Sequence, residues 1–154
     1  MCAVPTVNVE HLYITTESRR PHKVGVHPTE YDPLMDRTFM FVGALMGFVG
    51  VGLGAFGAHA LKGRLSPDML AVFETGVRYQ MYHALALLAT AALMARSDGR
   101  AVVVAGWSFT AGILLFSGSL YALAFTGVTM LGAVTPIGGV AFLAGWVALA
   151  IAAF

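Results

Sequence analysis

The stretch Gly43-Ala-Leu-Met-Gly-Phe-Val-Gly-Val-Gly-Leu-Gly-Ala-Phe-Gly-Ala-His59 decides how this chain folds, because its glycines follow a helical repeat. Most of them are spaced alternately four and three residues apart, which places them along one narrow seam of a helix. In a soluble helix each interior glycine costs about 1 kcal/mol relative to alanine, whereas in a bilayer a seam of small residues lets a second helix approach closely. We therefore predict a membrane helix whose packing seam consists of Gly43, Gly47, Gly50, Gly54 and Gly57.

The distribution of charged residues also predicts a membrane protein. Hydrophobic residues make up 58% of the 154 positions, which is more than soluble domains of this size use. All nine Lys and Arg and all eight Asp and Glu lie at or before Arg100, so the 54 residues from Ala101 to Phe154 carry no acidic or basic side chain. That length corresponds to about two bilayer crossings. The net charge of +1, without a basic stripe, argues against nucleic acid as a partner.

Four apolar segments predict an all-α, integral membrane four-helix bundle over residues 37–154. The first, residues 38–61, is free of charge between Arg37 and Lys62. The second begins after Ser66, which suits a helix N-cap, and its Pro67 suits the first helical position. Pro136 is expected to kink the fourth helix or to mark its true start, and Gly138 and Gly139 offer it a second close-packing surface. The predicted helices span residues 38–61, 67–95, 102–125 and 131–154.

Residues 1–36 form a polar, mostly irregular N-terminal arm that contains four prolines and mixed charges. The arm lacks the apolar core of a secretory signal. Its composition cannot bury enough surface to order it alone, so we expect an extended strap on a partner subunit, or an arm without fixed structure.

The distribution of Lys and Arg predicts an orientation for the bundle. With four crossings, the arm and the link between the second and third helices lie on one side of the membrane, and the link between the first and second helices lies on the other. The first of these sides carries more Lys and Arg. Both chain ends are then expected on the cytoplasmic side of a bacterial inner membrane, or on the matrix side of a mitochondrial inner membrane. The six residues on that side are Arg19, Arg20, Lys23, Arg37, Arg96 and Arg100, against Lys62 and Arg64 on the other, or three residues there if Arg78 is counted.

Polar side chains inside the predicted spans are the candidate site. Glu74 and Arg78 are spaced by four residues in the order that favours an ion pair, which predicts a clasp near one membrane surface together with His59. His83 lies deeper, where a polar ring must find a hydrogen-bond partner. Tyr79 on its own helix and Ser117, Ser119 or Tyr121 on the third are the predicted partners. A lock between two helices is the favoured role of His83, and a proton relay is the alternative.

The sequence contains no pattern typical of a metal, cofactor or catalytic site. Cys2 is the only cysteine, and the histidines lack the spacing of a metal-binding helix. No nucleophile motif, Walker loop or dinucleotide-binding glycine pattern occurs. We expect no cofactor, no metal and no enzymatic activity.

Four motifs in this order resemble the family called domain of unknown function four-two-three, which comprises small bacterial inner-membrane proteins and a eukaryotic transmembrane relative. The motifs are Gly54-Ala-Phe-Gly-Ala-His59, Thr75-Gly-Val-Arg-Tyr79-Gln80-Met-Tyr-His83-Ala-Leu85-Ala, Leu115-Phe-Ser-Gly-Ser-Leu-Tyr121 and Thr135-Pro-Ile-Gly-Gly-Val-Ala-Phe-Leu-Ala-Gly-Trp146.

The resemblance implies a four-helix membrane protein and no established activity. Glu74, Arg78 and the arm lie outside the family pattern, so the resemblance gives the clasp no general role. The polar positions that the resemblance implies are His59, Tyr79, Gln80, His83, Ser117, Ser119, Tyr121, Thr135 and Pro136.

We expect a non-enzymatic accessory or structural subunit of a larger membrane assembly, for example a respiratory-type complex, because the surface is apolar and the loops are too short for a soluble site. Its expected partners are membrane lipids and other membrane protein subunits, with self-association as a further option. The alternative is a small transporter or channel-like protein. In that alternative the residues lining a cavity between helices would be His59, Gln80, His83 and Tyr121.

Overall fold

The structure, a computed structural model, describes residues 33–94, 96 and 99–153, and these residues form helices joined by short turns, with no strand among them. The predicted all-α fold is confirmed. Residues 1–32, which hold most of the predicted arm and its strap, lie outside the described residues.

The first half of the described chain forms a helical hairpin. α1 (Pro33–Phe56) continues through a π-helical turn, η2 (Gly57–Leu61), and α2 (Pro67–Met94) follows after a short link. Ser66 caps α2 as predicted, since the Met69 amide donates to Ser66 Oγ at 3.3 Å. α1 begins five residues earlier than predicted, so the last residues of the predicted arm are helical.

The second half forms another hairpin. Its first long helix has two α-helical parts joined by a π-helical turn, and it ends at Gly127, whose φ of 68° is the left-handed conformation typical of a glycine C-cap. Pro136 marks the true start of the last helix, as one of the two predicted alternatives states, because it lies in the first turn of the observed helix. A 3₁₀ turn occupies residue 131, so the start predicted there is four residues too early. The elements are α3 (Arg100–Gly112), η3 (Ile113–Ser117), α4 (Gly118–Thr126), η4 (Thr129–Ala133) and α5 (Thr135–Ala152).

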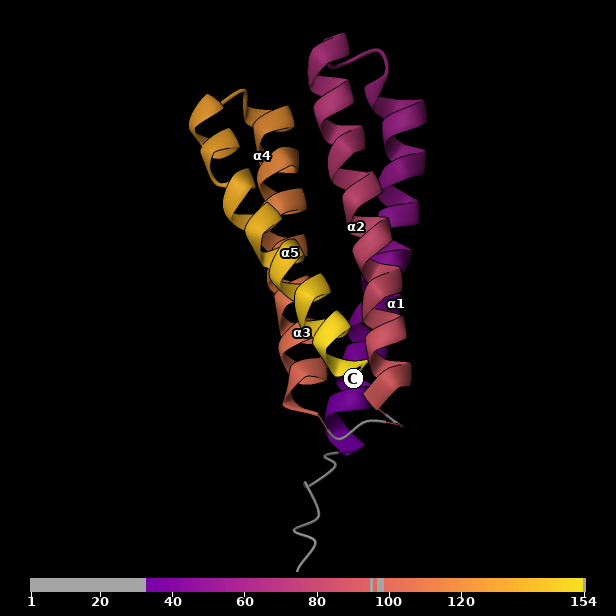
Figure 1. The fold of residues 1–154 in the computed structure, drawn as a ribbon. Coiled ribbons are helices and arrows are strands. Elements are labelled where there is room, and N and C mark those ends of the chain that lie inside the picture. Colours follow the sequence, from indigo (N-terminus) through magenta and orange to yellow (C-terminus); the bar gives the residue numbers. More distant parts are fainter. Residues whose placement is uncertain (1–32, 95, 97–98, 154) are drawn as a thin grey trace, which may run out of the picture.

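The two hairpins lie side by side as an up-down-up-down bundle (Figure 1). The start of α1 and the end of α5 lie at one end of the bundle, and the turns at residues 62–66 and 127–134 lie at the other. Among the residues that the structure describes, three helical segments are long and apolar enough to cross a membrane, namely Leu34–Leu61, Arg100–Thr126 and Thr129–Ala152. α2 is long enough, at about 1.5 Å per residue over 28 residues, but its polar first half makes it less apolar.

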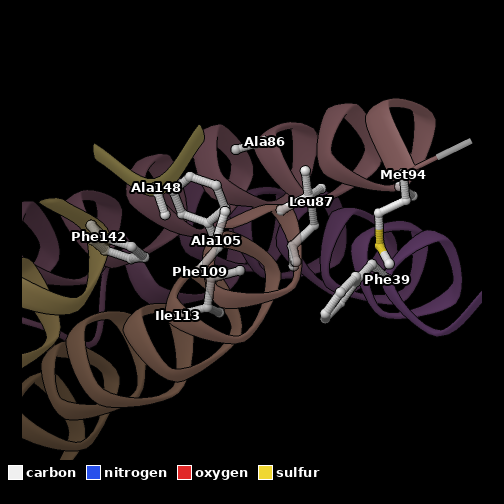
Figure 2. Packing of buried hydrophobic residues seen from close by; sticks show 11 residues of the cluster. Phe39, Ala86, Leu87, Met94, Ala105, Phe109, Ile113, Phe142 and Ala148 are labelled. Atoms are coloured by element: carbon white, nitrogen blue, oxygen red, sulfur yellow. The ribbon is translucent and has the colours of Figure 1, made fainter. Parts of the chain in front are cut away.

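Glycines in this bundle receive large side chains from neighbouring helices. A Cβ atom at Gly145 would overlap the Phe109 ring, one at Gly112 the Phe142 ring, and one at Gly106 the Phe39 ring. These three rings belong to the main core cluster, which Figure 2 shows at close range. Glycines on one helix therefore make room for aromatic side chains of another helix. Close packing of this kind stabilises helix contacts in a bilayer, where the hydrophobic effect does not drive helices together.

The predicted seam on the first helix is only partly a packing surface. Gly43, Gly50 and Gly57 are buried against α2, and a Cβ at Gly50 would lie 2.6 Å from Met81 Sδ. Gly47 has no neighbour within 4 Å of such an atom, and Gly54 meets Val77 only at an ordinary 3.5 Å. The contact repeats every seven residues because two helices crossing at a shallow angle meet at that interval.

Of the predicted packing glycines on the last helix, Gly138 and Gly139, only one contacts a neighbouring helix closely. A Cβ at Gly138 would overlap the backbone of Phe116, at 2.7 Å from its Cα, whereas one at Gly139 would lie 3.9 Å from the Phe116 ring. Only Gly138 is a close-packing position, because successive residues on a helix point in different directions.

The adjacent glycines allow a matched test of this packing. Gly138→Ala should lower the unfolding free energy in detergent by about 1–3 kcal/mol, because a backbone cannot move aside as a side chain can. Gly139→Ala should leave it unchanged or slightly raised, since alanine favours the helix. Equal losses in a thermal or denaturant melt of the two variants would contradict the close approach of α5 to η3.

Candidate functional site

Gln80 connects three helices at the centre of the bundle. Its side chain is 3% exposed and lies near the middle of α2. Nε2 donates a hydrogen bond of 2.8 Å to the carbonyl oxygen of Met46 on α1, and Oε1 accepts one of 2.9 Å from the Tyr121 hydroxyl on α4. Both ends of the amide are thus paired, which a buried amide in lipid requires.

Two glycines give Gln80 access to these partners. Gly50 lies one helical turn after Met46, and a Cβ there would be in contact with Gln80 Nε2 at 3.5 Å, so the bare backbone leaves the Met46 carbonyl reachable. Gly76 lies one turn before Gln80, and the Tyr121 ring fills the space of its missing side chain, at 2.8 Å from the Cβ position. Glycines on α1 and α2 therefore make room for the two hydrogen bonds of Gln80, which together form a polar bridge between the three helices.

His83 is held from both sides of its ring. Nδ1 lies 2.8 Å from the carbonyl oxygen of Tyr79, and the indole Nε1 of Trp146 on α5 donates to Nε2 at 3.3 Å. An indole N–H can only donate, so Nε2 must accept and the proton of a neutral ring must be on Nδ1. This assignment leaves no free nitrogen to take up a proton while the Trp146 contact is in place.

Aromatic side chains enclose the imidazole. The ring stacks on Phe142 with centroids 3.4 Å apart and planes inclined by 6°, and Phe109 and Trp146 pack at 5.6 and 6.2 Å. Beside it is a groove of about 470 Å³ between α2 and α5. Tyr79, which is 40% exposed and stacks on Phe116, forms one wall of this groove. The site is a packed aromatic cluster with one open side on the surface of the bundle.

The two serines of the third helix have different surroundings. Ser119 Oγ bonds the Phe116 carbonyl and the Thr135 hydroxyl, each at 2.9 Å, and so ties α4 to the start of α5. Ser117 Oγ is buried in the π-helical turn and has no hydrogen-bond partner among the described residues. Neither serine bonds His83, so its predicted partners on this helix are wrong, and Tyr121 bonds Gln80 instead.

His59, Glu74 and Arg78 lie apart from this cluster. His59 is exposed in η2, and Glu74 and Arg78 are exposed on α2. Arg78 donates to the carbonyl oxygen of Glu74 and to the Thr75 hydroxyl, each at 3.4 Å, rather than to the Glu74 carboxylate. The predicted clasp is therefore not formed in the described part of the chain.

Sequence reasoning did not identify Trp146 as the partner of His83. A signal was present, because an indole N–H inside an apolar helix needs an acceptor and His83 is a buried side chain that can accept. No group of three His, Cys, Asp or Glu side chains within the described ranges could hold a metal ion.

Comparison with known proteins gives a family and no activity. The family described as "Protein of unknown function (DUF423)" matches residues 53–139. The chain is 49% identical over 118 residues to the UPF0382 membrane protein YwdK of Bacillus subtilis, an alignment covering 76% of this chain and 96% of the relative. It is 48% identical to the UPF0382 membrane protein SAB0533 of Staphylococcus aureus, with 77% and 96% covered. No solved structure matches.

The contacts of His83 predict different effects for two substitutions. His83→Leu should lower stability by about 1 kcal/mol, the usual scale of an interhelical hydrogen bond in membranes, because the Trp146 indole loses its acceptor. His83→Gln should retain most of the stability, since an amide offers both a donor and an acceptor. Thermal melts in detergent measure both variants, and a His83→Leu protein as stable as the wild type would contradict the lock.

Proposed function

This chain belongs to the membrane protein family of unknown function matched above, and on that premise we propose that it is a non-enzymatic accessory or structural subunit packed into a larger membrane assembly. The observation that supports this proposal is that the two most polar buried side chains in the middle of the bundle, those of Gln80 and His83, bond other side chains or helix backbones. Gln80 bonds Met46 and Tyr121, and both nitrogens of His83 are occupied. Polar groups arranged in this way fix helix positions, and a transported substrate would have to displace them.

The outer surface and the links support the same role. Large apolar side chains are exposed along α1 and α5, for example Phe48 at 79% and Leu143 at 67%. The turns at residues 62–66 and 127–134 hold only a few residues, which is too short for a catalytic loop outside the bilayer. A protein of this shape offers helix faces to lipids and to other membrane proteins.

We further propose that the assembly lies in a bacterial or mitochondrial inner membrane, with both chain ends on the cytoplasmic or matrix side. This placement rests on the sequence, in which the residues before α1 and the link between α2 and α3 carry more Lys and Arg than the link between η2 and α2, and it follows the positive-inside rule.

The transporter alternative is favoured only by the groove beside His83. Its walls include Tyr79, His83 and Trp146, and its remaining lining is apolar. Two of these apolar residues, Val140 and Leu143, are exposed. A path for ions or polar solutes needs a chain of exposed polar groups across the bilayer. The groove does not supply such a chain.

Purification and flux measurements separate the two functions. The tagged full-length protein, extracted from its native membrane in mild detergent, should migrate on a blue native gel with other membrane proteins. In reconstituted phosphatidylethanolamine–phosphatidylglycerol vesicles it should produce no proton flux above that of protein-free vesicles.

The accessory-subunit proposal fails if no other membrane protein co-purifies. It also fails if the vesicles show a pH-dependent flux that His83→Gln abolishes while the melting temperature stays unchanged.

A further inference from the structure

α2 exposes charged side chains on a face that other helices do not cover. Glu74, Arg78 and Tyr82 are spaced by four residues, and all three are exposed. Residues with this spacing lie above one another on a helix, so the three form a stripe along the outside of the bundle. Exposed charges on a helix in lipid are rare unless a partner satisfies them.

The packing of α2 on α1 gives the depth of this stripe. A Cβ at Gly57 would meet Phe73, the residue before Glu74, and one at Gly54 would meet Val77, the residue before Arg78. These glycines precede the charged Lys62 by five and eight residues, so Glu74 and Arg78 lie roughly 7 and 12 Å inward from Lys62 along the helix axis. Both backbones are therefore within the apolar span.

The two charges are close on one helix but do not form a pair with each other. The guanidinium of Arg78 bonds a carbonyl and a hydroxyl at 3.4 Å, both long hydrogen bonds, and the Glu74 carboxylate has no cationic partner among the residues that the structure describes. Beside them is a hollow of about 260 Å³, lined by Gly54, Gly57, Phe73, Glu74, Val77 and Arg78. This hollow leaves room for a side chain from another molecule.

We propose that a second copy of this chain docks on this stripe, with α2 against α2 about a two-fold axis along the membrane normal. In such a dimer each residue meets the equivalent face of the other copy, so Glu74 pairs with Arg78 of the second copy and Arg78 with its Glu74. This inference rests on the proposed function and deepens it by naming the first partner.

The geometry of α2 suits this exchange. Arg78 is four residues, or about 6 Å, deeper than Glu74. Both side chains tilt toward the helix N-terminus, the end nearer Glu74, and the arginine side chain is the longer of the two, so the guanidinium extends toward the level of the carboxylate of the second copy. Two ion pairs form and the face carries no net charge.

Charge complementarity favours a second copy over an anionic lipid. A phosphate headgroup would pair with Arg78 but would be repelled by Glu74 one turn away, which leaves the carboxylate without a cationic partner. A protein face with one acid and one base in the same register satisfies both, and the chain itself carries such a face.

Charge reversal in the full-length protein tests the dimer. Wild-type protein in mild detergent should be dimeric by light scattering, and Glu74→Arg or Arg78→Glu alone should weaken self-association by at least about tenfold, because like charges then oppose each other. A mixture of the two variants should form a heterodimer, since one copy supplies two bases and the other two acids. Asp68→Arg, with the same change of charge on another face of α2, is the control and should remain dimeric.

The outcomes separate this inference from the proposed function. A wild-type monomer, or single variants that dimerise as the wild type does, would overturn the dimer. If other membrane proteins still co-purify in that case, the accessory-subunit proposal stands without it. Recovery of the heterodimer by mixing excludes misfolding as the reason for the loss in the single variants.

Discussion

A side-chain amide inside a bilayer has no water with which to form hydrogen bonds, so both of its ends must find partners within the protein. Gln80 meets this requirement only where α1, α2 and α4 lie in one relative position, with the Met46 carbonyl on one side and the Tyr121 hydroxyl on the other. The bridge thereby fixes how the first hairpin lies against the second. His83 and Trp146 repeat the arrangement between α2 and α5.

These interhelical hydrogen bonds can form because the helices approach each other closely. Gly50 exposes the backbone that Gln80 reaches, and Gly76 admits the ring of Tyr121. The same exchange of a missing side chain for an aromatic ring recurs at Gly112 and Gly145, which receive Phe142 and Phe109. Those two rings also pack against His83, so glycine positions set the surroundings of the polar groups as well as the distance between helices.

The sequence predicted the number of helices and most of their bounds, because these follow from apolar length, from charges at the ends and from caps such as Ser66. It also placed Gln80 and His83 among the important polar residues. It could not predict their partners, because those depend on how far each helix is rotated about its axis. This rotation decides that Gly47 has no close neighbour although it belongs to the predicted seam. It also decides that the Trp146 indole is the partner of His83.

The central claim is that the mid-bundle polar groups hold helices together. A double-mutant cycle on Gln80→Leu and Tyr121→Phe tests it most directly, with unfolding free energies measured in bicelles. The account predicts that the two losses are not additive and that the coupling is about 0.6–1.7 kcal/mol, the range of hydrogen bonds between membrane helices. Additive losses, with no coupling between the two side chains, would contradict it.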